Sequence, residues 1–134
     1  MTMRACVTDT HPLLFHASGG RRLGGRARRH FQACESRRAL TYVPAVVMWE
    51  TCLLARARRV SLGRSTRSFF DDLFSNPAFL PLDLTAEQVW LADEGAPNRD
   101  PLDALVCAAA RSVELPLLTR DVDIHESDLV TCIW

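Results

Sequence analysis

The segment from Asp100 to Asp121, DPLDALVCAAARSVELPLLTRD, constrains the fold of this chain most strongly. Asp100 and Pro101 are typical of a helix N-cap and first helical position, and the apolar residues after them recur at helical spacing. Pro116 then starts a short apolar run that ends before Asp121. The segment therefore predicts a buried helix, a tight turn and a buried strand, with an acidic residue near each end.

Two acids of this segment, Asp103 and Asp121, are candidate site residues. Asp103 is the one charged side chain in the apolar run 102–110. A carboxylate on a buried helix is costly unless another group compensates it. Asp121 follows the predicted strand, and ligands of α/β proteins bind at the carboxyl ends of strands. Further acids of a shared site would be expected upstream, at other strand ends or on other apolar helix faces.

The rest of the chain alternates short apolar strands with helices. The predicted strands cover residues 4–8, 40–43, 79–82, 117–118 and about 130–133. A helical turn starts at Pro12, and further helices are expected over about 23–36, 45–58, 65–75 and 85–94. This alternation predicts an α/β fold with a small, mostly parallel β-sheet sandwiched by helices. Since no repeat or interdomain linker is present, we expect residues 1–134 to form a single domain.

Asp9 and Glu50 have the same character as the two downstream acids. Asp9 follows the first predicted strand, where it would either cap the next helical turn or take part in a site. Glu50 lies in the middle of an apolar helical stripe that we expect to face the core, made of Val46, Trp49, Leu53, Leu54 and Ala57. Two interpretations stay open for Glu50: an ion pair with an arginine, or a metal-binding or catalytic carboxylate.

Asp9, Glu50, Asp103 and Asp121 would repel one another if they converged. Two carboxylates about 5 Å apart repel by roughly 3 kcal/mol at an effective dielectric constant near 20. A divalent cation relieves this repulsion, and oxygen ligands favour Mg²⁺ or Mn²⁺. Such an ion can activate water and neutralise charge on a phosphoryl group. The four acids therefore indicate metal-dependent phosphodiester hydrolysis.

The formal net charge of zero hides an uneven distribution. Residues 1–67 carry 13 Arg and 3 acids, whereas residues 68–134 carry 3 Arg and 13 acids, and the chain has no lysine. Arginine binds phosphate through its planar guanidinium, so the basic half suggests a polyanionic partner. The alternative is that the two halves pair with each other. Seven arginines surround the predicted helix 23–36 with a single acid, Glu35, among them, which favours RNA contact; a merely solvated charged face is the alternative. The candidate RNA-binding residues are Arg21, Arg22, Arg28 and Arg29.

Several classes of site and location are disfavoured. The longest clearly apolar run, Val43–Trp49, has seven residues and is too short to span a bilayer. With no apolar secretory segment at the start, we expect a soluble, cytoplasmic protein that does not bind a membrane. The five cysteines form no CxxC pair, which favours free thiols over zinc ligands. A chain without lysine cannot have a P-loop.

Four segments, in this order, resemble the PIN domain, and within it the VapC-type toxin ribonucleases of bacterial type II toxin–antitoxin pairs. They are VTDTH at 7–11, VPAVVMWE at 43–50, DPLDAL at 100–105 with the following AAA at 108–110, and PLLTRD at 116–121. The ending SDLV at 127–130 with Ile133 and Trp134 is also similar to that group. The resemblance covers the whole chain.

This resemblance implies a PIN-like fold and an endoribonuclease that uses Mg²⁺ or Mn²⁺. It places Asp9, Glu50, Asp103 and Asp121 at the metal-binding, catalytic positions. Asp100 resembles the family's helix-capping acid and Thr119 a hydroxyl beside the site, and Thr10 would be a further supporting position. Asp123 is an extra acid near the cleft, which we interpret as a solvated or capping residue, with a supporting role at the site as the alternative. The resemblance further implies a homodimer, an RNA substrate and a VapB-type antitoxin that blocks the cleft.

Two other functions remain as alternatives. A PIN-fold binding or regulatory module would keep the fold without catalysis, and a DNA-directed nuclease would keep the chemistry on a different substrate. The presence of all four acids favours an enzyme over a binding module. The small size and the VapC-like ending favour RNA over DNA.

Overall fold

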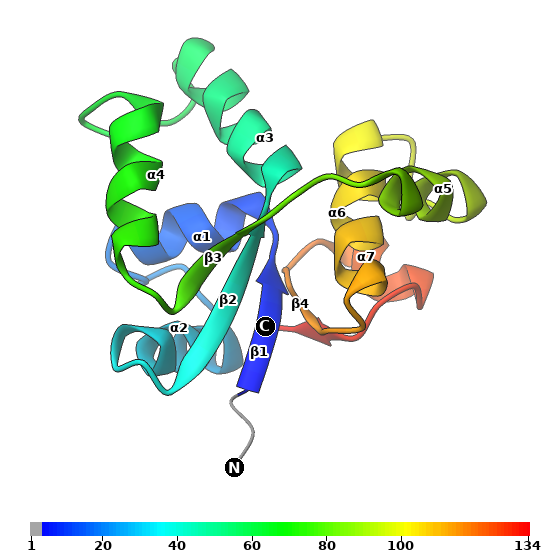
Figure 1. The fold of residues 1–134 in the computed structure, drawn as a ribbon, viewed down its shortest axis with the longest axis horizontal. Helices are drawn as coiled ribbons and strands as arrows, with labels where there is room; N and C mark the ends of the chain where they lie inside the picture. Colours follow the sequence, from blue (N-terminus) through cyan, green and yellow to red (C-terminus); the bar gives the residue numbers. More distant parts are fainter. Residues whose placement is uncertain (1–3) are drawn as a thin grey trace.

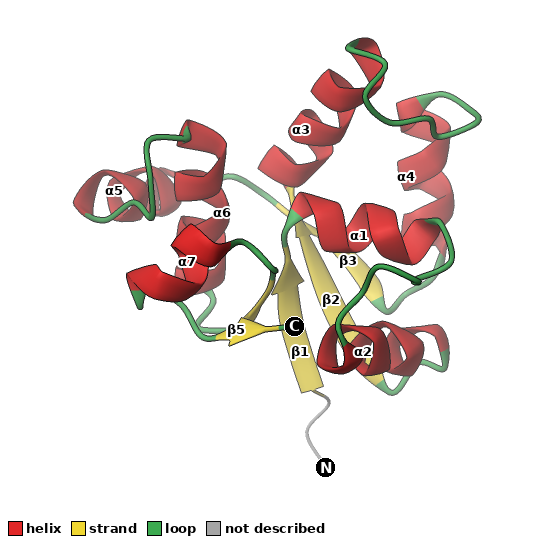
Figure 2. Cartoon of the chain, turned by 180° about the vertical axis from the view of Figure 1, so that it is seen from behind, coloured by secondary structure: helices red, strands yellow, loops and turns green. Residues whose placement is uncertain are grey.

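A computed structural model describes residues 4–134. Its centre is a five-stranded sheet in which every neighbouring pair of strands is parallel. The strands are β1 (Arg4–Thr8), β2 (Ala39–Pro44), β3 (Phe79–Leu82), β4 (Leu117–Leu118) and β5 (Cys132–Ile133), in the order β3-β2-β1-β4-β5. The α/β fold with a parallel sheet flanked by helices, predicted from the sequence, is confirmed (Figures 1 and 2).

Seven helices of the described chain surround this sheet. They are α1 (Thr10–Ala17), α2 (Gly25–Glu35), α3 (Ala45–Arg56), α4 (Thr66–Ser75), α5 (Ala86–Glu94), α6 (Pro101–Ser112) and α7 (Val122–Ser127). Helices α1 to α4 gather around the β2 and β3 half of the sheet, and α5 to α7 lie beside β4 and β5 (Figures 1 and 2). No helix within residues 4–134 has the length and apolar character needed to cross a membrane.

The core is built on the central strand and on helix α6. Cys6 and Val7 of β1 are fully buried, as expected for a parallel strand with helices on both faces. The largest fully buried side chains, Phe31, Phe79, Leu13, Leu117 and Leu118, come from both halves of the chain. Buried alanines let helix α6 pack closely, as the sequence of this segment predicted; they are Ala104, Ala108, Ala109 and Ala110.

The predicted core face of helix α3 is wrong in part. Trp49 and Leu53 are 48% and 38% exposed, and Ala57 is also exposed; the buried residues of α3 are Val46, Val47 and Thr51. The Thr51 hydroxyl donates a 2.8 Å hydrogen bond to the Val47 carbonyl, so its polar atom is satisfied inside the helix. A threonine therefore takes an interior position that hydropathy assigned to larger apolar residues.

Three element boundaries also differ from the sequence prediction. Helix α1 begins at Thr10, two residues before Pro12, because Asp9 caps it. The segment after Asp121 forms the short helix α7, for which no element was predicted. Strand β5 is limited to Cys132–Ile133. All five cysteines are free thiols, with Cys6, Cys34 and Cys107 buried.

Candidate active site

Five carboxylates line one cavity of about 390 Å³. They belong to Asp9, Glu50, Asp100, Asp103 and Asp121, and the cavity wall also includes His11 and Arg120. Parallel pairing of β1 with β4 places Thr8 opposite Leu118, so the residues that follow the two strands come out at the same edge of the sheet. Helices α3 and α6 add Glu50 and Asp103 from the side. The structure thus brings together the four acids that the sequence singled out.

The N-termini of three helices meet at this cavity. The Asp9 side chain accepts a hydrogen bond from Thr10 N at the start of α1, and Asp100 accepts one from Leu102 N at the start of α6. Asp121 accepts one from Ile124 N at the start of α7. Helix N-termini carry partial positive charge and stabilise anions. These caps explain how the fold holds so many carboxylates in one place.

Asp9 is the most buried of the five acids. Its Oδ1 accepts from Thr10 N and its Oδ2 accepts from the Thr119 hydroxyl, both at 2.8 Å. The pKa of the Asp9 carboxyl is raised to about 6, mainly by burial and in smaller part by the charges of Asp103 and Glu50, while the two hydrogen bonds lower it. Asp9 is therefore both a helix cap and a carboxyl poised to change protonation close to neutral pH.

Asp103 is half-buried and has a partner that the sequence analysis missed. Asn98 Nδ2 donates to Asp103 Oδ2 at 2.9 Å and to Asp123 Oδ2 at 3.3 Å, while Asn98 Oδ1 accepts from Asp100 N at 2.8 Å. Burial raises the pKa of Asp103, as do the charges of Asp100, Asp121 and Glu50, and the Asn98 hydrogen bond lowers it. Asn98 has no motif of its own; its position two residues before a helix cap was the available signal.

Glu50 has no arginine partner in the described chain. The ion pairs within residues 4–134 are His16–Glu35, Arg64–Asp72 and Arg67–Asp71. An ion pair for Glu50, one of its two interpretations, is therefore not observed. These pairs also show how far the basic half of the sequence, residues 1–67, pairs with the acidic half. Within residues 4–134, two ion pairs join the halves, Arg64–Asp72 and Arg67–Asp71, and both lie at the surface on or next to α4. Most arginines of the basic half have no acid partner among the described residues.

The supporting positions lie next to the acids. Thr119 is fully buried; besides the bond to Asp9, its Oγ1 accepts from Asp121 N at 3.1 Å, and its carbonyl lies 2.8 Å from His125 Nε2. Asp123 is exposed and touches the site only through Asn98. Thr10 is fully buried, and its Oγ1 has no hydrogen-bond partner within the described residues.

The four arginines expected to contact RNA have different surroundings. The Arg28 guanidinium donates to the carbonyls of Gly20 and Arg21, at 2.9 and 3.3 Å, and so ties the loop before α2. The Arg22 guanidinium lies 4.8 Å from the centroid of the Phe15 ring. Arg21 and Arg29 are exposed. RNA contact by these residues stays a prediction.

The donor set of the cavity fits a hard divalent cation. All five acidic side chains offer oxygen ligands, which suit Mg²⁺ and Mn²⁺. Burial, with repulsion among the neighbouring carboxylates, raises the pKa of Asp9 and Asp103, and a bound cation would offset both effects. Across residues 4–134, however, no three His, Cys, Asp or Glu side chains already form a metal-binding group.

The model of the PIN domain matches residues 6–128 of this chain. The chain belongs to the PIN domain family. Its fold is similar to that of VapBC2 from Rickettsia felis, solved with a promoter DNA fragment, with a TM-score of 0.69, 12% identity, and coverage of 96% of this chain and 97% of that one. DNA-bound VapBC from Salmonella typhimurium gives a TM-score of 0.66 at 14% identity, covering 98% of both chains.

A third similar structure of this PIN domain chain is VapC20 from Mycobacterium tuberculosis, described as a toxin that cleaves the sarcin–ricin loop. It aligns with a TM-score of 0.64 at 19% identity, covering 93% of this chain and 96% of that one. No curated protein matches the sequence. At these identities the structural matches establish the fold, which agrees with the family.

Proposed function

We propose that this PIN domain chain is a metal-dependent endoribonuclease and the toxin component of a toxin–antitoxin pair. The observation that carries the proposal is the cavity in which Asp9, Glu50, Asp103 and Asp121 converge beside three helix N-termini. A purely structural role would not require so many carboxylates at one partly buried position, because each raises the free energy of the others.

Asp9, Glu50, Asp103 and Asp121 would hold the Mg²⁺ or Mn²⁺ ion. When bound, the ion would supply Lewis-acid activation of water and neutralise charge on the scissile phosphate. The chain's own residues set up this chemistry. Thr119 and Thr10 N keep the two oxygens of Asp9 in place, and Asn98 orients Asp103. Arg120, which lines the same cavity, would add a positive charge at its edge that attracts the phosphate backbone of the substrate.

RNA is the proposed substrate. VapC20, a toxin that cleaves an RNA loop, shares the fold, and the arginines around α2 lack acid partners within the described residues. A DNA-directed nuclease and a PIN-fold binding module are the competing functions. A binding module would retain its behaviour after an acid is neutralised, whereas an enzyme would lose its activity.

The proposed protein partners are a VapB-type antitoxin and a second copy of this chain. Two of the similar structures are VapBC complexes, which supports the antitoxin. Large apolar side chains are exposed on α3 and on α5 with the segment before it, which suits a protein contact such as a homodimer; they are Trp49, Leu53, Leu84, Val89 and Trp90. We further propose that residues 1–134 form one domain and that the protein acts in the cytoplasm, where its RNA substrate is found.

The test uses cells, because a sequence-specific ribonuclease is easily missed on a generic substrate. Wild type and Asp103→Asn would be induced in a bacterial host without an antitoxin, and new RNA 5′ ends would be mapped. The expected result is growth arrest and new 5′ ends with the wild type alone. Equal arrest by both proteins without new 5′ ends would contradict the catalytic proposal and favour the binding module, and the same new ends with folded Asp103→Asn would remove Asp103 from the catalytic site. Cleavage of DNA but not of RNA by the purified wild type would favour the DNA-directed nuclease.

A further inference from the structure

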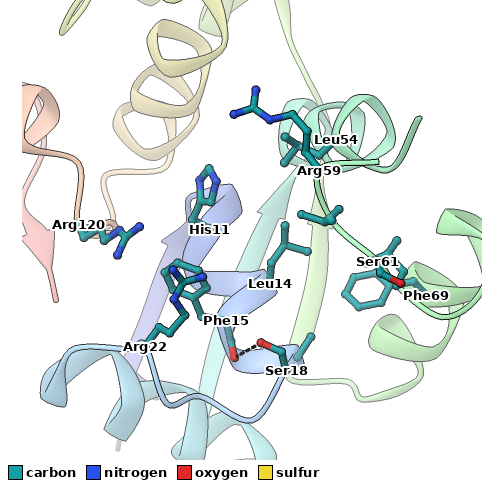
Figure 3. Close-up of a pocket in the computed structure, with 13 residues that line it drawn as sticks. His11, Leu14, Phe15, Ser18, Arg22, Leu54, Arg59, Ser61, Phe69 and Arg120 are labelled. Carbon is teal, nitrogen blue, oxygen red and sulfur yellow. Dashed lines mark hydrogen bonds between the residues drawn. The ribbon is translucent and has the colours of Figure 1, made fainter. Parts of the chain in front are cut away.

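A second cavity adjoins the acidic one and has the opposite charge. It has a volume of about 470 Å³ and lies between α1, the end of α3 and the start of α4 (Figure 3). Arg22, Arg59 and Arg120 line it, and no Asp or Glu of the described chain does. His11 and Arg120 line both cavities. An anion leaving the acidic cavity on this side would therefore meet a basic one directly.

Two of the arginines are held in place by one aromatic ring. The guanidinium carbons of Arg22 and Arg120 lie 4.8 and 4.9 Å from the centroid of Phe15, which is itself buried. Figure 3 shows both guanidinium groups next to Phe15, with His11 and Arg59 facing the same space. The face of an aromatic ring attracts cations. Phe15 thus fixes two positive groups that come from loops 98 positions apart.

Neither guanidinium has an acidic partner within residues 4–134. Both arginines line the same cavity, so an anion bound there would be attracted by two positive charges. Arginine presents a planar set of donors that matches the geometry of a phosphate, and prior fixation on Phe15 reduces the freedom it would lose on binding. Both arginines are solvent-exposed, and their shared contact with Phe15 and the shared cavity are what set them apart from the other surface arginines.

We propose that the Arg22–Phe15–Arg120 cluster binds a phosphodiester of the RNA strand next to the one positioned at the acidic cavity. This inference rests on the proposed ribonuclease function. An RNA strand whose scissile phosphate lies among the carboxylates must continue out of the acidic cavity. The basic cavity is next to it, because the two cavities share the wall residues His11 and Arg120. The competing occupant is an acidic segment of a protein partner, which the test separates from RNA.

The experiment measures RNA binding without cleavage. A short fluorescent single-stranded RNA would be titrated in chelator, over a range of salt concentrations, with fluorescence anisotropy as the readout. Arg22→Gln and Arg120→Gln should each weaken binding roughly threefold and reduce the slope of log affinity against log salt by about 0.7, the value for one lost phosphate contact on a single strand. Arg22→Lys should retain most of the slope because it keeps the charge.

The matched control is Arg67→Gln, which removes the same charge from an exposed position on α4 that does not line the cavity. It should leave affinity and slope unchanged. A positional check uses a series of RNAs in which one phosphate at a time is replaced by a neutral methylphosphonate. When the replaced phosphate is the one that the cluster binds, Arg22→Gln and Arg120→Gln should no longer weaken RNA binding. Circular dichroism would establish that all variants are folded.

Two results would overturn the inference. The first is an unchanged salt slope in folded Arg22→Gln and Arg120→Gln; with a wild type that still cleaves RNA, the inference fails while the ribonuclease function stands. The second is tighter binding of a polyglutamate peptide than of RNA through the same two arginines, which would assign the cavity to an acidic protein segment. If the arginine effects appear but no RNA is cut with Mg²⁺ or Mn²⁺, the phosphate site stands and the catalytic function fails.

Discussion

The hydroxyl of Thr119 donates a 2.8 Å hydrogen bond to Asp9 Oδ2, which joins two buried residues 110 positions apart in the chain. This bond favours the ionised form of Asp9, against the burial that raises the pKa of this carboxyl. Thr119→Val should therefore raise the pKa of Asp9 further and destabilise the fold by about 1–3 kcal/mol, the usual effect of removing a hydrogen bond to a charged group. Carbon-detected NMR titration and urea unfolding, both in chelator, measure the two effects.

Thr119→Ser is the matched control for this prediction, because serine keeps the hydroxyl and removes only a methyl group. It should restore most of the wild-type pKa of Asp9. An unchanged Asp9 pKa in folded Thr119→Val would mean that the hydrogen bond does not tune this carboxyl.

Asp9 should make the stability of the metal-free protein depend on pH. The folded chain holds the Asp9 proton up to a pKa of about 6, whereas an unfolded chain releases it near 3.8. Between these two values the folded state binds more protons, so stability falls as pH rises. The difference between the two pKa values corresponds to about 3 kcal/mol of unfolding free energy. The free energy of unfolding of Asp9→Asn should therefore exceed that of the wild type by up to about 3 kcal/mol at neutral pH. Near pH 4 the two proteins should have almost the same stability.

Urea unfolding of both proteins in chelator, at a series of pH values, checks this linkage. Acids that do not interact with Asp9 contribute equally to the two curves, so the difference reports Asp9 together with its coupling to Asp103 and Glu50. Parallel curves, with no pH dependence in the difference, would show that the Asp9 carboxyl is not perturbed by the fold.

Asn98 should act as a positioning residue for the acidic cavity. Its amide holds Asp103 and Asp123, and its carbonyl oxygen holds the backbone of Asp100. Asn98→Ala should weaken Mn²⁺ binding by about 10- to 100-fold, the usual effect of removing a group that orients a metal ligand. Isothermal titration calorimetry measures this without a substrate. Asn76→Ala is the control, because Asn76 orders a loop before β3 through Ala78 N; equal loss in both variants would point to general destabilisation.

Gly24 and Gly25, at the start of α2, should differ sharply in their tolerance of alanine. A Cβ on Gly24 would lie 2.5 Å from the backbone carbon of Trp134, whereas on Gly25 it meets only the flexible end of Arg29 at 3.4 Å. Gly24→Ala should therefore destabilise by about 1–3 kcal/mol through overpacking. Gly25→Ala should be neutral or slightly stabilising, since alanine favours the helix. Thermal unfolding compares them, and equal melting temperatures would contradict the close approach of Trp134 to α2.

The sequence predicted the sheet and the acids well because their signals are local. The apolar runs at β1 and β2 end at Asp9 and at Pro44, and strand ends lie at one edge of a parallel sheet. The run around Asp103 is apolar on all sides, so a buried helix with one exceptional charge was evident from the residues alone.

The sequence did not predict contacts in which a side chain's partner lies far along the chain or is a backbone carbonyl of its own helix. Thr51 buries a hydroxyl by bonding to Val47, which reversed the expected exposure of Trp49 on α3. The bridging role of Asn98 depends on Asp123, 25 positions away. Arg22 and Arg120 meet only because both pack on Phe15. Such contacts follow from the three-dimensional packing, and spacing along the chain does not reveal them.

Glu50 provides the sharpest test of whether the acidic cavity is a metal-dependent site for RNA cleavage. Purified wild type, Glu50→Gln and the exposed-site control Glu87→Gln would be incubated with bacterial RNA and Mn²⁺, with mapping of new 5′ ends and calorimetric measurement of Mn²⁺ affinity. We predict specific cleavage by the wild type and Glu87→Gln, and loss of both cleavage and metal affinity in a folded Glu50→Gln. Full cleavage and unchanged metal affinity in Glu50→Gln would contradict this function for the cavity and remove Glu50 from the site.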